Sequence, residues 1–160
     1  MTRWLTEEEH RAWRGLLQMT SQLDAHLSRQ LQDESGLSRA DYDVLVPLSE
    51  APGRRLRMFE LGAELCWQQS RLSHHLSRMQ KRGLVTREGC DSDRRGAYVV
   101  LTPAGCASIE KAAPSHVEAV RTLVFDGLSP GQVKALGAVA AHVLAKLEHE
   151  DAVDRQRERA

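Results

Sequence analysis

The chain has 160 residues, with 22 Lys or Arg and 22 Asp or Glu, so its formal net charge is zero. This length suits about one domain with its own core. The longest apolar run, 135–141, is far shorter than the roughly 20 residues of a membrane span, and the first ten residues are acidic, unlike a signal peptide. We therefore expect a soluble cytoplasmic protein without a membrane partner.

The charge is distributed unevenly along the sequence. Between Arg54 and Arg95 there are ten Lys or Arg residues and five Asp or Glu residues, and the rest of the chain has an excess of acids. A basic middle between acidic ends concentrates positive potential on one surface, which suits a polyanion. The alternative is a charged face that is merely solvated.

Two helices are predicted in the N-terminal part. Helical periodicity over 7–31 starts with Thr6 and Glu9, the spacing of a capping box, and Gly36 ends this element. Ser38 caps a second helix over 39–50. Pro47 lies inside that helix, so we expect a kink or an early end there.

The middle of the chain predicts a helix-turn-helix followed by a β-hairpin. A one-rung strand over 56–58 and a short helix over 59–66 precede a turn near Trp67 and a helix over 69–82, which Gly83 closes. On a helical wheel, Leu72, Leu76 and Met79 share the side that should face the core. Strands over 84–88 and 97–101 then pair across a loop over 89–96.

The C-terminal part predicts two more helices. The first runs from 103 to about 125, with a kink expected at Pro114, and the second starts at Pro130 with Ser129 as N-cap and runs to about Glu150, followed by a frayed tail. Helices 7–31 and 103–150 are more apolar than one winged unit requires. The sequence therefore predicts a single domain over 1–160 that is mainly α with a small β-hairpin: a winged helix-turn-helix over 39–101, flanked by N- and C-terminal dimerisation helices that form a homodimer.

A motif in and after the hairpin resembles that of the MarR family of bacterial regulators. RMQKRGLVTR at 78–87 is followed by DSDRR at 91–95 and VVLTPAG at 99–105, and the family's wing has the pattern D-x-D-R-R, then V-x-L-T-x-x-G. The resemblance implies a homodimeric, ligand-responsive transcription factor, usually a repressor, that binds a palindromic operator in double-stranded DNA. Gln68 and Gln69 stand where many members have Ser-Pro, and His74 stands where many have Arg, which leaves the preferred base sequence open.

The candidate DNA contacts follow from the chemistry of the exposed helix face and the wing. We expect Arg71 or His74 to reach base edges in the major groove, because Arg forms paired hydrogen bonds with guanine and the N-terminal part of a recognition helix enters deepest. At the wing, one arginine should enter the minor groove while an aspartate holds the other. The full set of expected DNA-binding residues is Gln68, Gln69, Ser70, Arg71, His74, Arg78, Lys81, Arg94 and Arg95, with Arg78 and Lys81 on phosphate and Arg94 favoured over Arg95 for the groove.

The resemblance also leads us to expect a binding site for a small-molecule effector. In the family, small aromatic acids and similar compounds often bind between the dimer helices and the winged domain. By that resemblance, Trp13 and Tyr42 could line a cleft for a small aromatic or anionic effector, with His26 or Arg14 near its charge. The alternative is that the aromatic residues belong to the core, which is the commoner place for them.

The remaining chemistry-bearing residues predict no cofactor and no metal. The cysteines are odd in number and form no CxxC; Cys66 and Cys106 should be buried, while Cys90 lies on the wing. We expect His74, His75, His142 and His149 to be surface histidines. The sequence holds no enzyme signature. A constitutive DNA binder, an activator, or a winged-helix module that docks protein stay open as alternatives.

Overall fold

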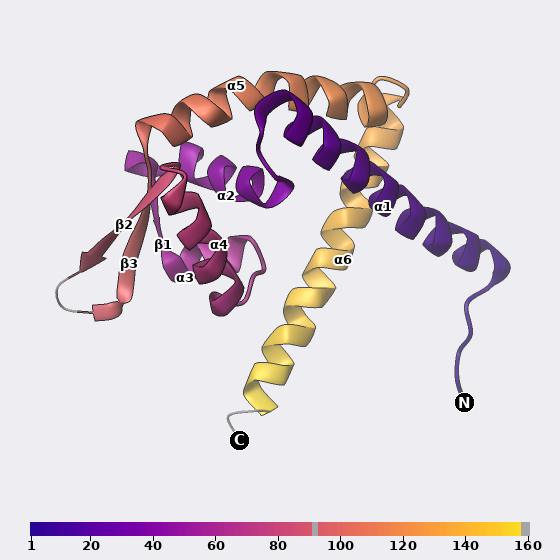
Figure 1. Ribbon diagram of the computed structural model, residues 1–160. Coiled ribbons are helices and arrows are strands. Elements are labelled where there is room, and N and C mark those ends of the chain that lie inside the picture. The colour runs from indigo at the N-terminus through magenta and orange to yellow at the C-terminus, as the bar shows by residue number, and fades with distance from the viewer. Residues whose placement is uncertain (91–92, 158–160) are drawn as a thin grey trace. The chain divides into compact units, whose positions relative to one another are not determined.

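The computed structural model describes the backbone of residues 1–90 and 93–157, and the side chains of these residues except 90, 93–96 and 152–156. The chain forms two compact units, Met1–Val117 and Glu118–Ala160. The first unit contains the winged helix-turn-helix, and Figure 1 shows its hairpin beside three short helices. None of the described helices is both long and apolar enough to cross a membrane.

The first two helices begin with reciprocal side-chain caps. Helix α1, Glu7–Ser35, starts at Thr6, whose N–H donates to Glu9 Oε2 at 2.8 Å while Glu9 N–H donates to Thr6 Oγ1 at 3.2 Å. It ends at Gly36, which has φ of 69°. Helix α2, Arg39–Glu50, does not end early at Pro47, because the carbonyl of Pro47 still accepts the N–H of Ala51 at 3.0 Å.

Three antiparallel strands form the sheet of the wing. After a short 3-10 turn, η1 at Pro52–Arg54, β1 covers Arg55–Arg57, β2 Val85–Cys90 and β3 Asp93–Leu101, in the order β1-β3-β2. Val99 of β3 stands opposite Leu56 on one side and Arg87 on the other. The hairpin strands are longer than the sequence predicts, since pairing continues through an irregularity after Glu88 as far as Cys90 and Asp93.

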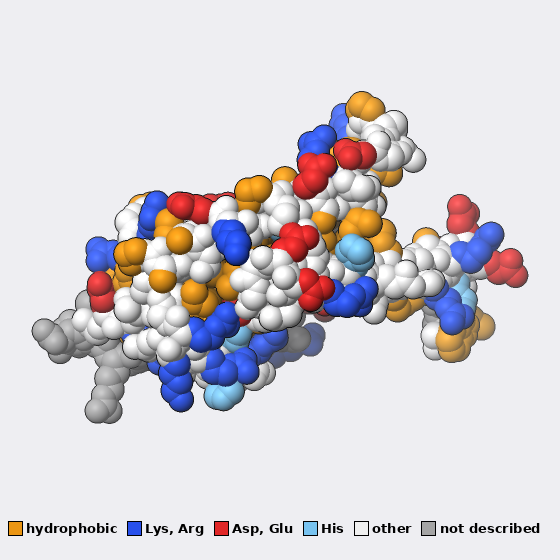
Figure 2. Space-filling view, turned by 45° about the horizontal axis from the view of Figure 1, so that its top comes forward, with side chains coloured by type: hydrophobic (Ala, Val, Ile, Leu, Met, Phe, Trp, Pro, Cys, Tyr) orange, Lys and Arg blue, Asp and Glu red, His pale blue; other side chains and the backbone are white. Residues whose placement is uncertain are grey.

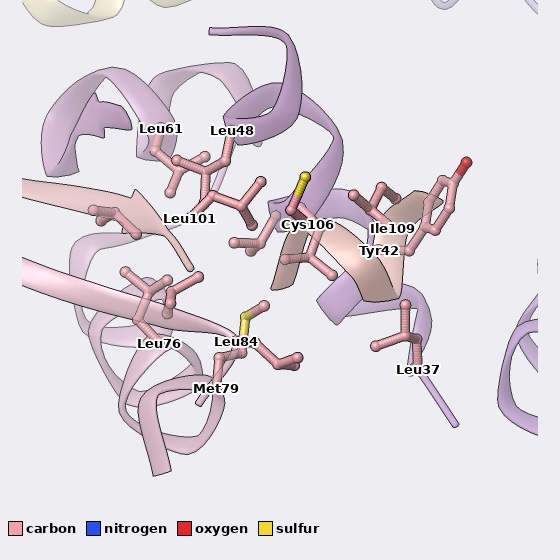
Figure 3. Packing of buried hydrophobic residues seen from close by; sticks show 14 of the residues in the cluster. Leu37, Tyr42, Leu48, Leu61, Leu76, Met79, Leu84, Leu101, Cys106 and Ile109 are labelled. Carbon is pink, nitrogen blue, oxygen red and sulfur yellow. The ribbon is translucent and has the colours of Figure 1, made fainter. Parts of the chain in front are cut away.

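The helix-turn-helix packs on this sheet through an apolar core. Helix α3 covers Met58–Glu64 and α4 covers Gln69–Lys81, close to the predicted bounds, and Gly83 follows α4 with φ of 73°. Leu72, Leu76 and Met79 of α4 are fully buried, which confirms the predicted inward face. They join side chains from α2, α3, the strands and α5 in one cluster (Figure 3).

A close approach joins the hairpin to helix α5, Pro103–Val120. The hydroxyl of Thr102 donates to the carbonyl of Gly83 at 2.6 Å and accepts the N–H of Gly105 at 2.9 Å. A Cβ at Gly105 would overlap the carbonyl oxygen of Leu84 and lie 2.7 Å from Leu101 Cδ1. Glycine is required at this position because any side chain would push the hairpin away from α5.

The second unit is helical along most of its length. The end of α5 continues into η2, Arg121–Phe125, which is π-helical, and α6 covers Pro130–Arg157. Ser129 caps α6 as predicted, since its Oγ accepts the N–H of Gln132 at 3.3 Å. Helix α6 extends past Glu150, so the tail expected to be frayed is helical as far as Arg157.

Large apolar side chains are exposed on α1 and on α6. On α1, Leu27 and Leu31 are buried but Leu16 is 43% exposed. At 100° per residue, the exposed apolar side chains of α6 fall within an arc of about 140°, which makes one continuous stripe. The exposed residues are Trp13, Leu16, Leu17 and Met19 on α1, and Val133, Leu136, Val139, Val143, Leu144 and Leu147 on α6.

Candidate nucleic-acid interface

Helix α4 presents polar and cationic side chains opposite its buried leucines. Lys, Arg and His side chains gather along the lower edge of the winged unit in Figure 2. All of the residues predicted for the DNA-contacting face of this helix are exposed: Gln68, Gln69, Ser70, Arg71, His74, Arg78 and Lys81. No described side chain caps the N-terminus of α4 at Gln68, so its first N–H groups have no side-chain acceptor there.

The turn before α4 holds Arg71 in place. The N–H of Trp67 donates to the carbonyl of Gly62 at 2.9 Å, which holds the backbone of this turn against α3. The Arg71 guanidinium lies 4.1 Å from the centroid of that indole ring, within the range of a cation–π contact. In the sequence, this contact is indicated by the spacing of four residues, about one helical turn, between Trp67 and Arg71.

Cys66 and His75 differ from their predictions. Cys66 is exposed rather than buried, because it lies in the turn between α3 and α4, with φ of 53°. His75 is 6% exposed rather than a surface histidine. Three residues after Leu72 and four before Met79, it shares their buried face.

His75 links the exposed face of α4 to helix α2. Its Nε2 lies 3.1 Å from Oδ1 of Asp41, and its Nδ1 lies 2.9 Å from Nη2 of Arg78. Because a guanidinium can only donate, Nδ1 is the acceptor in this contact. The predicted phosphate contact Arg78 is therefore oriented by a buried histidine.

Asp41 connects the start of α2 to the end of α4. The carboxylate is 2% exposed, and its Oδ2 accepts Arg82 Nη1 at 2.7 Å and the N–H of Ser38 at 2.9 Å. Burial by itself would raise the pKa of Asp41, but His75, Arg82 and Ser38 together outweigh burial and hold the pKa well below its ordinary value. Arg82 thus links the end of α4 to the start of α2.

Arg87 ties the wing to the recognition helix. Its Nη2 donates to the carbonyl of Ser73 at 2.6 Å and to Oγ of Ser77 at 3.2 Å, so β2 is anchored along α4. Sequence reasoning missed this role and counted Arg87 only as positive charge. At the other edge of the sheet, Arg55 and Arg57 stack on the ring of Tyr98, at 4.8 and 4.5 Å.

The predicted wing contacts stay predictions. Arg94 and Arg95 belong to β3, but their side chains lie outside the described part of the chain, as do those of the two wing aspartates. The backbone pairing of Cys90 with Asp93 places this segment at the far end of the hairpin.

The two predicted effector residues lie in different surroundings. Tyr42 is buried, with its ring 4.4 Å from that of His116. It also lines a pocket of about 380 Å³ between α2 and the turn after α3, whose lining residues are Tyr42, Asp43, Val46, Pro47, Glu64, Leu65 and Trp67. Trp13 is 51% exposed on α1 and does not line this pocket, and neither do Arg14 and His26.

Two observations bear on metal binding and on thiol reactivity among the described residues. No group of three or more His, Cys, Asp or Glu side chains there is placed to hold a metal ion. Cys106 is buried as predicted, and its contact with Glu110 at 3.1 Å, followed by burial, raises the pKa of the thiol. A raised pKa disfavours the reactive thiolate.

The chain is similar in sequence and structure to known transcriptional regulators. A family model described as "MarR family" matches residues 35–96. Sco3205, a MarR family transcriptional regulator from Streptomyces coelicolor whose structure was solved in complex with DNA, is 45% identical, with 92% of each chain covered and a TM-score of 0.88. AbsC, a MarR family regulator from the same organism, is 41% identical over 92% of this chain and 99% of its own, with a TM-score of 0.87. A MarR family regulator from Silicibacter pomeroyi is 30% identical over 90% of this chain and 96% of its own, with a TM-score of 0.68. No protein with a curated description matches the chain.

Proposed function

The chain belongs to the MarR family of transcriptional regulators, and we propose that it is a cytoplasmic, ligand-responsive repressor that binds a palindromic operator as a homodimer. Helix α4 enters the major groove, and an arginine of the wing enters the minor groove. The observation that carries this proposal is the exposed face of α4, which carries cationic side chains away from three fully buried core residues.

The contacts on α4 divide into base and phosphate contacts. Arg71 lies in the first turn, and its stack on Trp67 leaves the N–H edges of the guanidinium available for a guanine. Arg78 and Lys81 lie nearer the end of the helix, where they suit phosphates. The N-terminus of α4, which no described side chain caps, can donate N–H groups to a further phosphate.

The exposed apolar stripes support the homodimer. Soluble monomers rarely expose contiguous apolar surface of this extent, and α1 and α6 each carry a row of large apolar side chains. A two-fold dimer would cover both rows and present two copies of α4, which would suit a palindromic site with half-sites about one helical turn apart. A regulator seated on such a site would repress by excluding polymerase, and an effector that shifts the two copies of α4 would release it.

DNA binding is tested by fluorescence anisotropy with duplexes from the promoter region of the chain's own gene. We expect Arg71→Ala to weaken binding to the operator more than to unrelated DNA, whereas Arg29→Ala, an exposed arginine on α1, should change neither. An equal loss on both kinds of DNA would make Arg71 a backbone contact. No binding by wild-type protein at low salt would refute the proposal.

The wing needs a separate measurement. Replacing Arg94 and Arg95 together with Ala should lower affinity and flatten the dependence of log affinity on log salt by roughly one unit for each phosphate that the variant no longer neutralises. An unchanged affinity and slope would remove the wing from the interface.

A further inference from the structure

We propose that the pocket between α2 and the turn joining α3 to α4 binds a small organic cation that carries an aromatic group. This deepens the proposed function, since such a compound would be the effector, but binding itself can be measured without DNA. It also chooses between the effector classes that the sequence left open, because it counts against an anion at this pocket.

The walls of the pocket are aromatic and apolar. Tyr42 is buried and Trp67 half-buried, and Val46, Pro47 and Leu65 complete the apolar lining. A volume of about 380 Å³ falls in the range of sites for small molecules, roughly 300–1,000 Å³. The indole and phenol rings can therefore pack against a flat group of comparable size.

The charges of the lining are negative. Two of the seven lining residues, Asp43 and Glu64, are carboxylates, and none is a cation. Asp43 is partly neutralised by Arg39, whose Nε lies 2.8 Å from its Oδ1, but Glu64 forms no ion pair among the described residues. A bound anion would be repelled by this carboxylate, whereas a cation would pair with it.

The combination of carboxylate and aromatic surface selects an organic cation over a metal ion. Aromatic faces attract quaternary ammonium groups, and an indole does so best. A hard divalent cation would instead need several oxygen ligands. No cluster of three possible metal ligands occurs in the described part of the chain.

Trp67 lines the pocket and also contacts Arg71, a residue of the proposed DNA-binding surface. Its ring carries the Arg71 guanidinium at 4.1 Å and meets the edge of the His75 ring at 5.5 Å. A compound bound against Trp67 therefore touches the side chain that positions the proposed base-reading arginine.

The test is isothermal titration of the full-length protein with three probes that share a benzyl or phenyl group: benzyltrimethylammonium, benzyl alcohol and benzoate. We expect the ammonium to bind with one site per subunit and more tightly than either of the others. Glu64→Gln should weaken it about fivefold, while Glu8→Gln, an exposed acid on α1 that does not line the pocket, should leave its affinity unchanged. Trp67→Leu should abolish binding.

Several results would overturn the proposal: benzoate or benzyl alcohol binding as tightly as the ammonium, or no effect of Glu64→Gln. Because Glu64 is exposed and forms no ion pair with the described side chains, its variant should fold even if Trp67→Leu does not. Ligand-free protein titrated with operator DNA tests the proposed function separately. If DNA binds and the ammonium does not, the cation site alone is wrong; if the ammonium binds and DNA does not, the regulatory function is wrong.

Discussion

Replacing Gly105 with Ala is expected to lower the free energy of unfolding by about 1–3 kcal/mol. The added Cβ would overlap the carbonyl oxygen of Leu84 and lie 2.7 Å from Leu101 Cδ1 and 3.1 Å from the carbonyl carbon of Leu84. Most of these atoms are backbone and cannot rotate away, so the hairpin must shift, at a cost of about 1–3 kcal/mol. The shift also strains the hydrogen bond from Gly105 to Thr102, worth about 1 kcal/mol, and the gain in helix propensity returns at most about 1 kcal/mol.

A matched substitution separates this clash from helix propensity. Gly15 lies within α1, and apart from the helix's own backbone no atom lies within 4 Å of its potential Cβ. Gly15→Ala should therefore raise the free energy of unfolding by about 0.5–1 kcal/mol. Urea unfolding followed by circular dichroism, at one protein concentration because a dimer's stability depends on it, compares the two variants. Equal stability of the two variants would refute the close approach at Gly105.

Three further predictions concern the buried carboxylate, the wing and the dimer. Because the pKa of Asp41 is lower in the folded than in the unfolded protein, the stability it contributes is present above the unfolded value of about 3.9 and is lost as pH falls below it, so Asp41→Asn should flatten the pH dependence of urea unfolding in that range; an equally steep curve would contradict this. Arg87→Met, which cannot donate hydrogen bonds to Ser73 and Ser77, should cost about 1–2 kcal/mol in urea unfolding and weaken operator binding, and unchanged values for both would show that the wing needs no anchor. Val139→Glu places a charge in the apolar stripe of α6 and should convert dimer to monomer in sedimentation velocity, so an intact dimer would exclude this stripe from the interface.

The distribution of positive charge overstates the surface available to DNA. Among the cations between Arg54 and Arg95, Arg82 is held by Asp41, and Arg87 by serines of α4. A charge count along the sequence includes these side chains, whose guanidinium groups already have partners, together with the exposed cations of α4.

The sequence by itself determined the local features. The caps at Thr6, Ser38 and Ser129, the end at Gly36 and the inward leucines of α4 depend on residues within one or two helical turns, where spacing alone fixes which groups meet. The motif in and after the hairpin is also a local feature, because the order and spacing of its residues are enough to show the resemblance to the family. The contact of the motif's Gly105 with the carbonyl of Leu84 is shown by the structure alone.

The tertiary structure decided which neighbours those local elements acquire. The spacing of His75 from Leu72 and Met79 places it on the buried face of α4, but only the packing of α4 against α2 gives it Asp41 as a neighbour. The pocket at Trp67 likewise joins side chains from two helices and a turn. Such contacts depend on how elements distant in sequence pack together, and no periodicity within a single element encodes that arrangement.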